Sequence, residues 1–278
     1  MNELIDYLTG KGSTYAYAII TGFFTILPET VFSMYKIFDN LAVWVNIAIN
    51  RLIVALIILI YVNWMYKIEQ NKRKSVTVAG DNYTVQIEYG NIFEKTDGKK
   101  VINFDECYTT KIGEAPSDIK PKSLCGQFLQ KYPIDDMQEL IDKAKVKPAR
   151  RKSLFQSLPC YEPGTIVPKG EFLLLAFAKL DKNGRAFLSY KEYLLCLDLL
   201  WQQIHCFYGT SDVYIPILGS LITNIDTNPT QQELLDIMIK SYMLSPYKIT
   251  KPYKLHIMCR EREDFSLCNI FKVEKSCN

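Results

Sequence analysis

The chain has 278 residues, with 33 lysines and arginines against 30 aspartates and glutamates. A formal net charge of +3 over this length gives no electrostatic reason to expect nucleic acid as a partner. The hydrophobic fraction is 48%, and the long apolar runs are concentrated in residues 13–66. We therefore expect two domains: a membrane anchor with its linker at residues 1–75, and a globular domain at residues 76–278 that is large enough to bury a core.

The run Leu41–Tyr66 is the clearest predicted membrane span, because a helix needs about 20 mostly apolar residues to cross a bilayer. Trp44 lies near one end of the run and Trp64 near the other, as expected for the two membrane interfaces. The start of the chain carries Glu3 and Asp6 instead of the basic stretch of a signal peptide. Positive charge marks the cytoplasmic side of a span, so residues 76–278 are expected in the cytoplasm. The basic residues that follow the run are Lys67, Lys72, Arg73 and Lys74.

An earlier apolar run, Tyr15–Phe38, is interrupted by Pro28 and Glu29. It forms either a second span, which would give a helical hairpin with the N-terminus inside, or a re-entrant or interfacial helix. We favour the span, because residues 15–27 are too apolar to leave in water.

Two charged residues, Glu29 and Arg51, lie in or beside these apolar runs. Charge at membrane depth is costly, so an ionisable residue there is a functional candidate by default. One interpretation is that Arg51 extends to the lipid headgroups, or that the span starts after it. The other is that Glu29 and Arg51 pair, or line a watery path between protomers, which makes both candidates for a membrane or pore function.

From residue 76 onward, strand and helix patterns alternate. A hairpin is predicted from Val76–Ala79 and Tyr83–Tyr89, around a turn at residues 80–82. Further strands are predicted at residues 100–104, 164–167, 171–179, 213–218 and 254–260, the last of which closes the sheet. Helices are predicted at residues 123–132, 135–145, 189–206 and 230–242, the third beginning with a Ser189–Glu192 capping box. This alternation predicts a layered α/β domain.

None of the eight cysteines belongs to a Cys-x-x-Cys pair, and several lie inside apolar runs. Because unoxidised cysteine is among the most buried residue types, we interpret them as free thiols in a reducing compartment. They are Cys107, Cys125, Cys160, Cys196, Cys206, Cys259, Cys268 and Cys277.

Three further features are interpreted as structural. The basic stretch at residues 143–152 is a solvated face, with contact to anionic lipid as the alternative. Residues 181–192 have part of a calcium-loop spacing, but Ala186 replaces the turn glycine and Arg185 opposes a cation, so no metal is expected. His205 and His256 are assigned structural or surface roles. Hydrolase motifs are absent from the sequence, so no catalytic residue is assigned.

Four strand-to-helix junctions carry glycine, asparagine or serine. In an open α/β sheet, ligands bind beyond the carboxyl ends of the strands, and free N–H groups at a helix start favour phosphate. The junctions therefore suggest a crevice for a nucleotide diphosphate, although the same residue types are also ordinary turn residues. The residues concerned are Gly90, Asn91, Asn103, Ser123, Gly126, Gly219 and Ser220.

The segments GNIF (90–93), KVINF (100–104), SLCGQF (123–128) and PILGS (216–220) resemble a macro domain, a family that binds ADP-ribose and related nucleotides. This resemblance implies a three-layer fold with a mixed sheet between helices, preceded here by the predicted transmembrane hairpin. It also implies ligand contacts from Asn91, Ile92, Asn103, Ser123, Gly126, Leu218, Gly219, Ser220 and Leu221.

The match to the macro-domain segments is imperfect. Asn91 stands where the family has an adenine-contacting aspartate, and Asn103 takes the place of its first asparagine. Leu221 replaces the second glycine of the second phosphate loop, and Glu106 replaces the second asparagine. These losses argue against a hydrolase.

Two hydrophobic segments followed by a divergent macro domain are similar to the membrane effector of bacterial Thoeris anti-phage defence, over essentially the whole chain. The resemblance implies a TIR-domain partner that makes the signal from NAD, and an ADP-ribose-derived signal such as histidine-ADP-ribose, with no other cofactor. It further implies a homo-oligomer that damages the bacterial inner membrane in abortive infection. The alternatives are a membrane-tethered ADP-ribosyl hydrolase and a membrane scaffold that binds no nucleotide.

Overall fold

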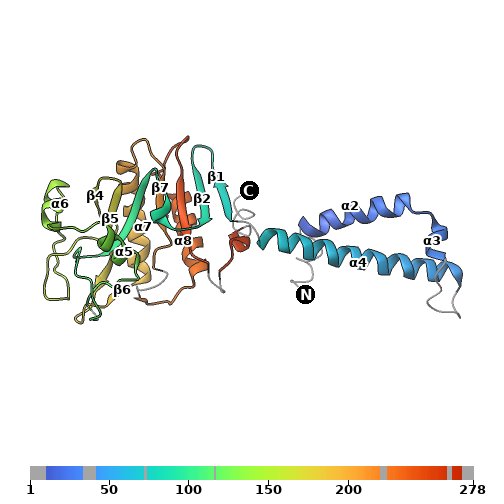
Figure 1. Ribbon diagram of the computed structural model, residues 1–278, viewed down its shortest axis with the longest axis horizontal. Helices are drawn as coiled ribbons and strands as arrows, with labels where there is room; N and C mark the ends of the chain where they lie inside the picture. The colour runs from blue at the N-terminus through green and yellow to red at the C-terminus, as the bar shows by residue number, and fades with distance from the viewer. Residues whose placement is uncertain are drawn as a thin grey trace. The chain divides into compact units, whose positions relative to one another are not determined.

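The computed structural model describes residues 11–33, 42–71, 74–115, 117–219, 224–261 and 265–270 (Figure 1). The chain divides into two compact units, Met1–Arg73 and Lys74–Asn278, here called the N-terminal and C-terminal units. Two of the predicted ligand contacts, Ser220 and Leu221, lie outside the described residues.

The N-terminal unit is helical. Its elements are α2 (Lys11–Ile26), α3 (Glu29–Ser33) and α4 (Val43–Asn71). Within the described residues, Val43–Tyr66 of α4 is the one helical stretch long and apolar enough to cross a membrane. Helix α2 has 16 residues, fewer than the about 20 that a span requires, and it ends just before Pro28. A second span at residues 15–38 therefore stays a prediction.

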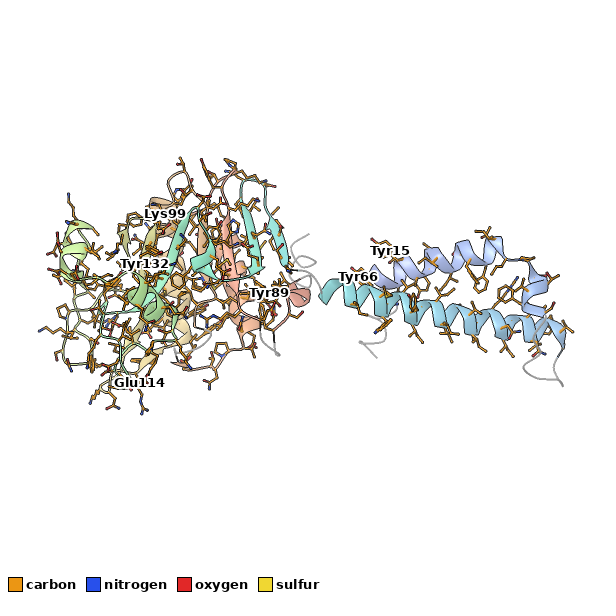
Figure 2. The ribbon with its side chains drawn as sticks, in the orientation of Figure 1. Tyr15, Tyr66, Tyr89, Lys99, Glu114 and Tyr132 are labelled. Carbon is orange, nitrogen blue, oxygen red and sulfur yellow. The ribbon has the colours of Figure 1, made fainter. Side chains whose placement is uncertain are left out.

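Helices α2 and α4 pack side by side, α3 also packs on α4, and polar contacts join α4 to α2 at one end and to α3 at the other (Figure 2). Near one end, Asn63 Nδ2 donates to Ser13 Oγ at 3.0 Å, and the rings of Tyr15 and Tyr66 lie 6.2 Å apart. Near the other end, Arg51 Nη2 lies 3.4 Å from Glu29 Oε1. The two charged residues of the apolar runs are therefore paired within one chain.

The C-terminal unit is built on a mixed sheet, for which the described residues give the strand order β1-β2-β9-β7-β3-β5-β6-β8, with β4 paired to β5. Strands β2, β9, β7, β3 and β5 run parallel to one another. Strand β1 pairs antiparallel with β2, and β4 and β6 pair antiparallel with β5, while β8 pairs parallel with β6. The strands are β1 (Ser75–Ala79), β2 (Thr84–Tyr89), β3 (Lys99–Asp105), β4 (Ile166–Lys169), β5 (Phe172–Leu180), β6 (Ala186–Leu188), β7 (Val213–Pro216), β8 (Asn224–Ile225) and β9 (Leu255–Cys259).

Helices cover both faces of this sheet. Alternate residues of β5 point to opposite faces, and the two cores they enter contain different helices. Helices α7 (Tyr190–Phe207) and α8 (Gln231–Leu244) pack on the face that holds Leu173 and Leu175. Helices α5 (Leu124–Lys131) and α6 (Met137–Lys143) pack on the face that holds Leu174. The predicted three-layer α/β arrangement is therefore confirmed for this unit.

The sequence located most elements, but it misplaced one strand. The segment at residues 254–260 was expected to close the sheet, yet β9 lies inside it between β2 and β7. The short strands β6 and β8 were not predicted, and the two 3-10 turns, η1 (Ile92–Glu94) and η2 (Leu267–Ile270), complete the described elements. The interior position of β9 matters, because it brings the residues that follow this strand to the candidate functional site.

Candidate functional site

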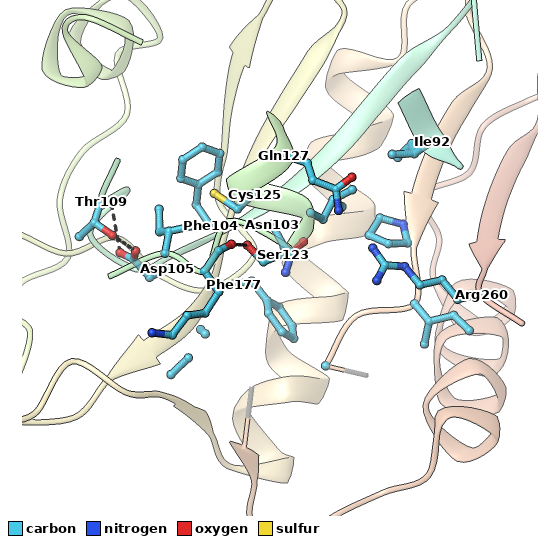
Figure 3. Close-up of a pocket in the computed structure, with 18 of the residues that line it drawn as sticks. Ile92, Asn103, Phe104, Asp105, Thr109, Ser123, Cys125, Gln127, Phe177 and Arg260 are labelled. Atoms are coloured by element: carbon cyan, nitrogen blue, oxygen red, sulfur yellow. Dashed lines mark hydrogen bonds between the residues drawn. The ribbon is translucent and has the colours of Figure 1, made fainter. Parts of the chain in front are cut away.

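A cavity of about 470 Å³ opens where five parallel strands end (Figure 3). Its walls come from the carboxyl ends of β2, β3, β5, β7 and β9, together with the first residues of α5 and α8. This is the place where open α/β sheets bind ligands. The junctions singled out in the sequence therefore meet at one hollow, and the predicted residues that line it are Gly90, Asn91, Ile92, Asn103, Ser123 and Gly219.

The turn after β2 forms one side of the cavity. Asn91 caps η1, because its side-chain oxygen accepts a hydrogen bond from Phe93 N at 3.1 Å. Ile92 is buried and packs with Tyr214 and Met258. The turn is thus fixed against the sheet while the Asn91 side chain stays exposed.

The end of β3 supplies the polar floor. Asn103 lines the cavity, and its amide makes no hydrogen bond to the described part of the chain. Asp105 also lines it, but its carboxylate is used locally: it accepts from Cys107 N at 2.8 Å and from the Thr109 hydroxyl. Burial raises the pKa of the Asp105 carboxyl. Of the two side chains, Asn103 is the one free to bond a ligand.

The start of α5 borders the cavity through Ser123, whose hydroxyl accepts from Gly126 N at 3.0 Å and caps the helix. Gly126 itself does not line the cavity. A Cβ at Gly126 would lie 2.2 Å from the Lys120 carbonyl oxygen, so glycine is needed for close packing behind the wall. The predicted ligand contact at Gly126 is thus not at the cavity.

Of the two predicted ligand contacts described after β7, Gly219 lines the cavity and Leu218 does not. Gly219 lines the cavity with φ +83, a left-handed conformation that favours glycine. Leu218 is 1% exposed, and its carbonyl accepts from the Tyr193 hydroxyl at 3.3 Å. Leu218 is therefore a core residue, and its predicted ligand contact is also displaced from the cavity.

Glu106 has an anchoring role that the sequence did not predict. It is 1% exposed and accepts hydrogen bonds from Arg151 Nη1 at 2.5 Å, Ser153 Oγ at 2.6 Å and Leu180 N at 3.2 Å. These contacts tie the segment after α6 to the ends of β3 and β5. The interpretation of the whole basic stretch as a solvated face is wrong for Arg151.

The two histidines lie outside the cavity lining. His205 Nδ1 lies 2.8 Å from the Lys248 carbonyl oxygen, and His256 lies between the carboxylates of Glu88 (2.8 Å) and Asp212 (3.2 Å). Across the described ranges, no cluster of histidine, cysteine and acidic side chains could hold a metal ion.

Sequence reasoning missed several residues of the cavity wall. The sequence could have predicted Arg260, because it lies at the end of the predicted strand that became β9, and β9 runs parallel to its neighbours β2 and β7. The residues of the segment between β3 and α5, in contrast, carry no local pattern that would have placed them. The missed wall residues include Asp105, Ser117, Asp118, Lys120, Phe177, Gln231 and Arg260.

The central strands of the sheet are parallel, and the sheet lies between two layers of helices. A cavity large enough for a small ligand lies at the carboxyl ends of these strands. Together these features define the class of α/β ligand-binding domains. Residues 85–260 match the family model for the macro domain of Thoeris protein ThsA. Because this match spans more than half of the chain, the chain belongs to that family.

Individual proteins to which the chain is similar include a curated relative and several solved structures. Thoeris protein ThsA of Bacillus amyloliquefaciens (strain Y2) is 29% identical over 211 residues, which cover 72% of this chain and 70% of that protein. Among solved structures, a mutant macrodomain of Oceanobacillus iheyensis has a TM-score of 0.49 at 10% identity, covering 73% of this chain and all (100%) of that one. The macrodomain of the same species with ADP has a TM-score of 0.41 at 11% identity, covering 73% and 95%. The family model and the similarity to Thoeris protein ThsA confirm the predicted relation to Thoeris macro-domain proteins.

Proposed function

We propose that this protein is a receptor in Thoeris defence, and that its C-terminal unit binds an ADP-ribose-type nucleotide. The observation that supports this most is the meeting of Asn91, Asn103, Ser123 and Gly219 at one cavity. Its volume, about 470 Å³, lies in the range of cavities that enclose small ligands.

The chemistry of the walls suggests how the nucleotide lies. We place the base beside Asn91 and Ile92, because Asn91 stands where the family has an adenine-contacting aspartate. We place the diphosphate between Ser123, which caps α5, and Gly219, in the turn after β7, because the N-terminus of a helix favours anions. The distal ribose then reaches the free amide of Asn103.

A binding role is favoured over hydrolysis. Glu106 stands where the macro-domain segment has its second asparagine, and its carboxylate is committed to Arg151 and Ser153. A side chain held in this way supports the wall and is not available to orient a water molecule or a ribose hydroxyl.

Isothermal titration of the full chain in detergent with ADP-ribose and with histidine-ADP-ribose tests this function. The Asn103→Ala variant should bind at least about tenfold more weakly, the loss expected for a buried hydrogen bond of about 1.5 kcal/mol. Asn183→Ala is the matched control, because Asn183 is exposed in the turn after β5 and its side chain does not line the cavity. Absence of binding by the wild type would support the scaffold alternative, and release of free ADP-ribose from a modified substrate would support a hydrolase.

The membrane part of the proposal rests on Val43–Tyr66. We propose that this segment anchors the protein in the bacterial inner membrane, with the C-terminal unit in the cytoplasm, and that a TIR-domain protein supplies the signal. Bound signal then favours an assembled state of several copies that disrupts the bilayer; it can do so only through different affinities for the two states.

Fractionation of cells after alkaline carbonate washing tests the anchor. Dye release from liposomes carrying the purified chain tests the lesion. Release that depends on histidine-ADP-ribose supports the proposal. Release that does not depend on the signal contradicts a ligand-controlled lesion, and recovery of the chain in the soluble fraction contradicts the anchor.

A further inference from the structure

Arg260 lines the cavity at the end of β9. It directly follows β9, which lies between β2 and β7, so it lies between the Asn91 turn and the Gly219 turn. Its backbone is held, because its carbonyl accepts from Gln231 Nε2 at 3.4 Å. The Arg260 side chain is exposed and extends from the strand end toward the middle of the cavity (Figure 3).

The charged side chains that line the cavity differ in whether they already make hydrogen bonds or ion pairs within the chain. Asp118 is paired with Lys111 at 3.1 Å. Lys120 Nζ donates to the carbonyl oxygens of Glu114 at 2.7 Å and Ala115 at 3.0 Å. Asp105 is bonded to Thr109 and Cys107, as described above.

Arg260 is the exception. Its guanidinium makes no hydrogen bond, ion pair or ring contact with the part of the chain that the structure describes. Ordering a long cationic side chain costs entropy, so a bound group that orders Arg260 has to supply a strong contact. A guanidinium supplies its strongest contacts to phosphate and carboxylate oxygens, which it can bind through two parallel N–H groups.

We propose that Arg260 binds the diphosphate of the nucleotide and contributes the positive charge that the helix N-termini alone provide only in part. This inference rests on the proposed function. It assigns a side-chain phosphate ligand at the end of the last strand, in addition to the backbone groups near Ser123 and Gly219. Because the group is cationic, it favours ligands that carry the diphosphate over the uncharged nucleoside.

Titration calorimetry of the full chain in detergent, with ADP-ribose and with adenosine as probes, tests the assignment. Arg260→Gln should weaken ADP-ribose binding about 10- to 100-fold, the range expected for a charge-assisted contact, and should leave adenosine binding unchanged. Arg260→Lys should recover part of the affinity, because it keeps the charge and loses the planar fork. Arg150→Gln is the matched control, since Arg150 is exposed and lies away from the cavity lining.

Salt dependence provides a second readout that a merely structural role would not change. The affinity of the wild type for ADP-ribose should fall as ionic strength rises, and that fall should be shallower in Arg260→Gln. Equal affinities of wild type and Arg260→Gln for ADP-ribose would overturn the assignment, as would an equal loss for adenosine, which would place Arg260 on the base. Failure of the wild type itself to bind ADP-ribose would instead refute the proposed function. Circular dichroism of each variant verifies that the fold is kept.

Discussion

The ion pair between Arg151 and Glu106 leads to the sharpest stability prediction. Replacing Arg151 with alanine leaves a carboxylate that is 1% exposed without its cation. Breaking a buried pair from one side costs about 3 to 5 kcal/mol. Arg151 is 33% exposed, and Ser153 and Leu180 still donate to Glu106, so we expect a cost just below that range, about 2 to 3 kcal/mol.

Urea unfolding of the full chain in detergent, followed by tryptophan fluorescence, measures this loss. Trp201 is 1% exposed in the C-terminal unit, and replacing Trp44 and Trp64 with phenylalanine leaves it as the sole reporter. Arg150→Ala is the control, because it removes the neighbouring, exposed arginine and should cost less than about 0.5 kcal/mol.

The physical cause can be separated from a loss of packing. If the cost of Arg151→Ala comes from an uncompensated buried charge, then adding Glu106→Gln should reduce that cost to below about 1 kcal/mol. An Arg151→Ala variant as stable as Arg150→Ala would refute the reasoning. So would a double variant that loses the sum of the two single costs.

Further predictions concern a turn, a pH dependence and a cap. Gly219→Ala should destabilise the protein by about 1 to 2 kcal/mol in the same urea assay, because the backbone is left-handed and the new Cβ would lie 2.8 Å from Ile225 Cδ1. Burial opposes ionisation of Glu192, but hydrogen bonds from Lys179 and Ser189 outweigh it and lower its pKa from 4.5 to about 2. Its stabilising contribution is therefore present above about pH 4.5 and lost as the pH falls toward 2, so Glu192→Gln should lose less stability than wild type between pH 6 and pH 3. Parallel plots of unfolding free energy against pH for wild type and Glu192→Gln would contradict this. Asn91→Ala removes the cap on Phe93 N and should cost about 1 kcal/mol in stability while also weakening ADP-ribose binding in titrations; an unchanged affinity would remove Asn91 from the site.

The sequence was informative wherever the cause of a structure is local. The Ser189–Glu192 capping box is present as predicted and starts α7. The apolar run of β5 is buried on both faces, as its composition indicated. Side-chain periodicity and capping depend on residues three or four positions apart, so they can be read without knowing the fold.

The failures have a common origin in contacts between distant residues. The position of β9 inside the sheet depends on which strands pair, and strand order is not encoded in a local pattern. Glu106 and Arg151 are 45 positions apart, and no local sequence pattern predicts that they form an ion pair. Strand β8 has two residues, too few for a period to be detected. Gly126 illustrates a subtler error, because a glycine needed for packing and one needed for a phosphate look the same in sequence.

The polar residues at the end of β3 offer the strongest physical argument for the proposed receptor. Asn103 and Asp105 lie at the end of the strand and Glu106 directly follows it, yet of the three side chains only the Asn103 amide remains free in the described structure. The Asp105 carboxylate is held by Cys107 and Thr109, and the Glu106 carboxylate by Arg151 and Ser153. A hydrolase needs a polar group able to activate water beside the ligand, and its hydrogen-bonding capacity must be available for that step. Here the neighbouring carboxylates are held by local hydrogen bonds and stabilise the wall, which favours the proposed binding role over the hydrolase alternative.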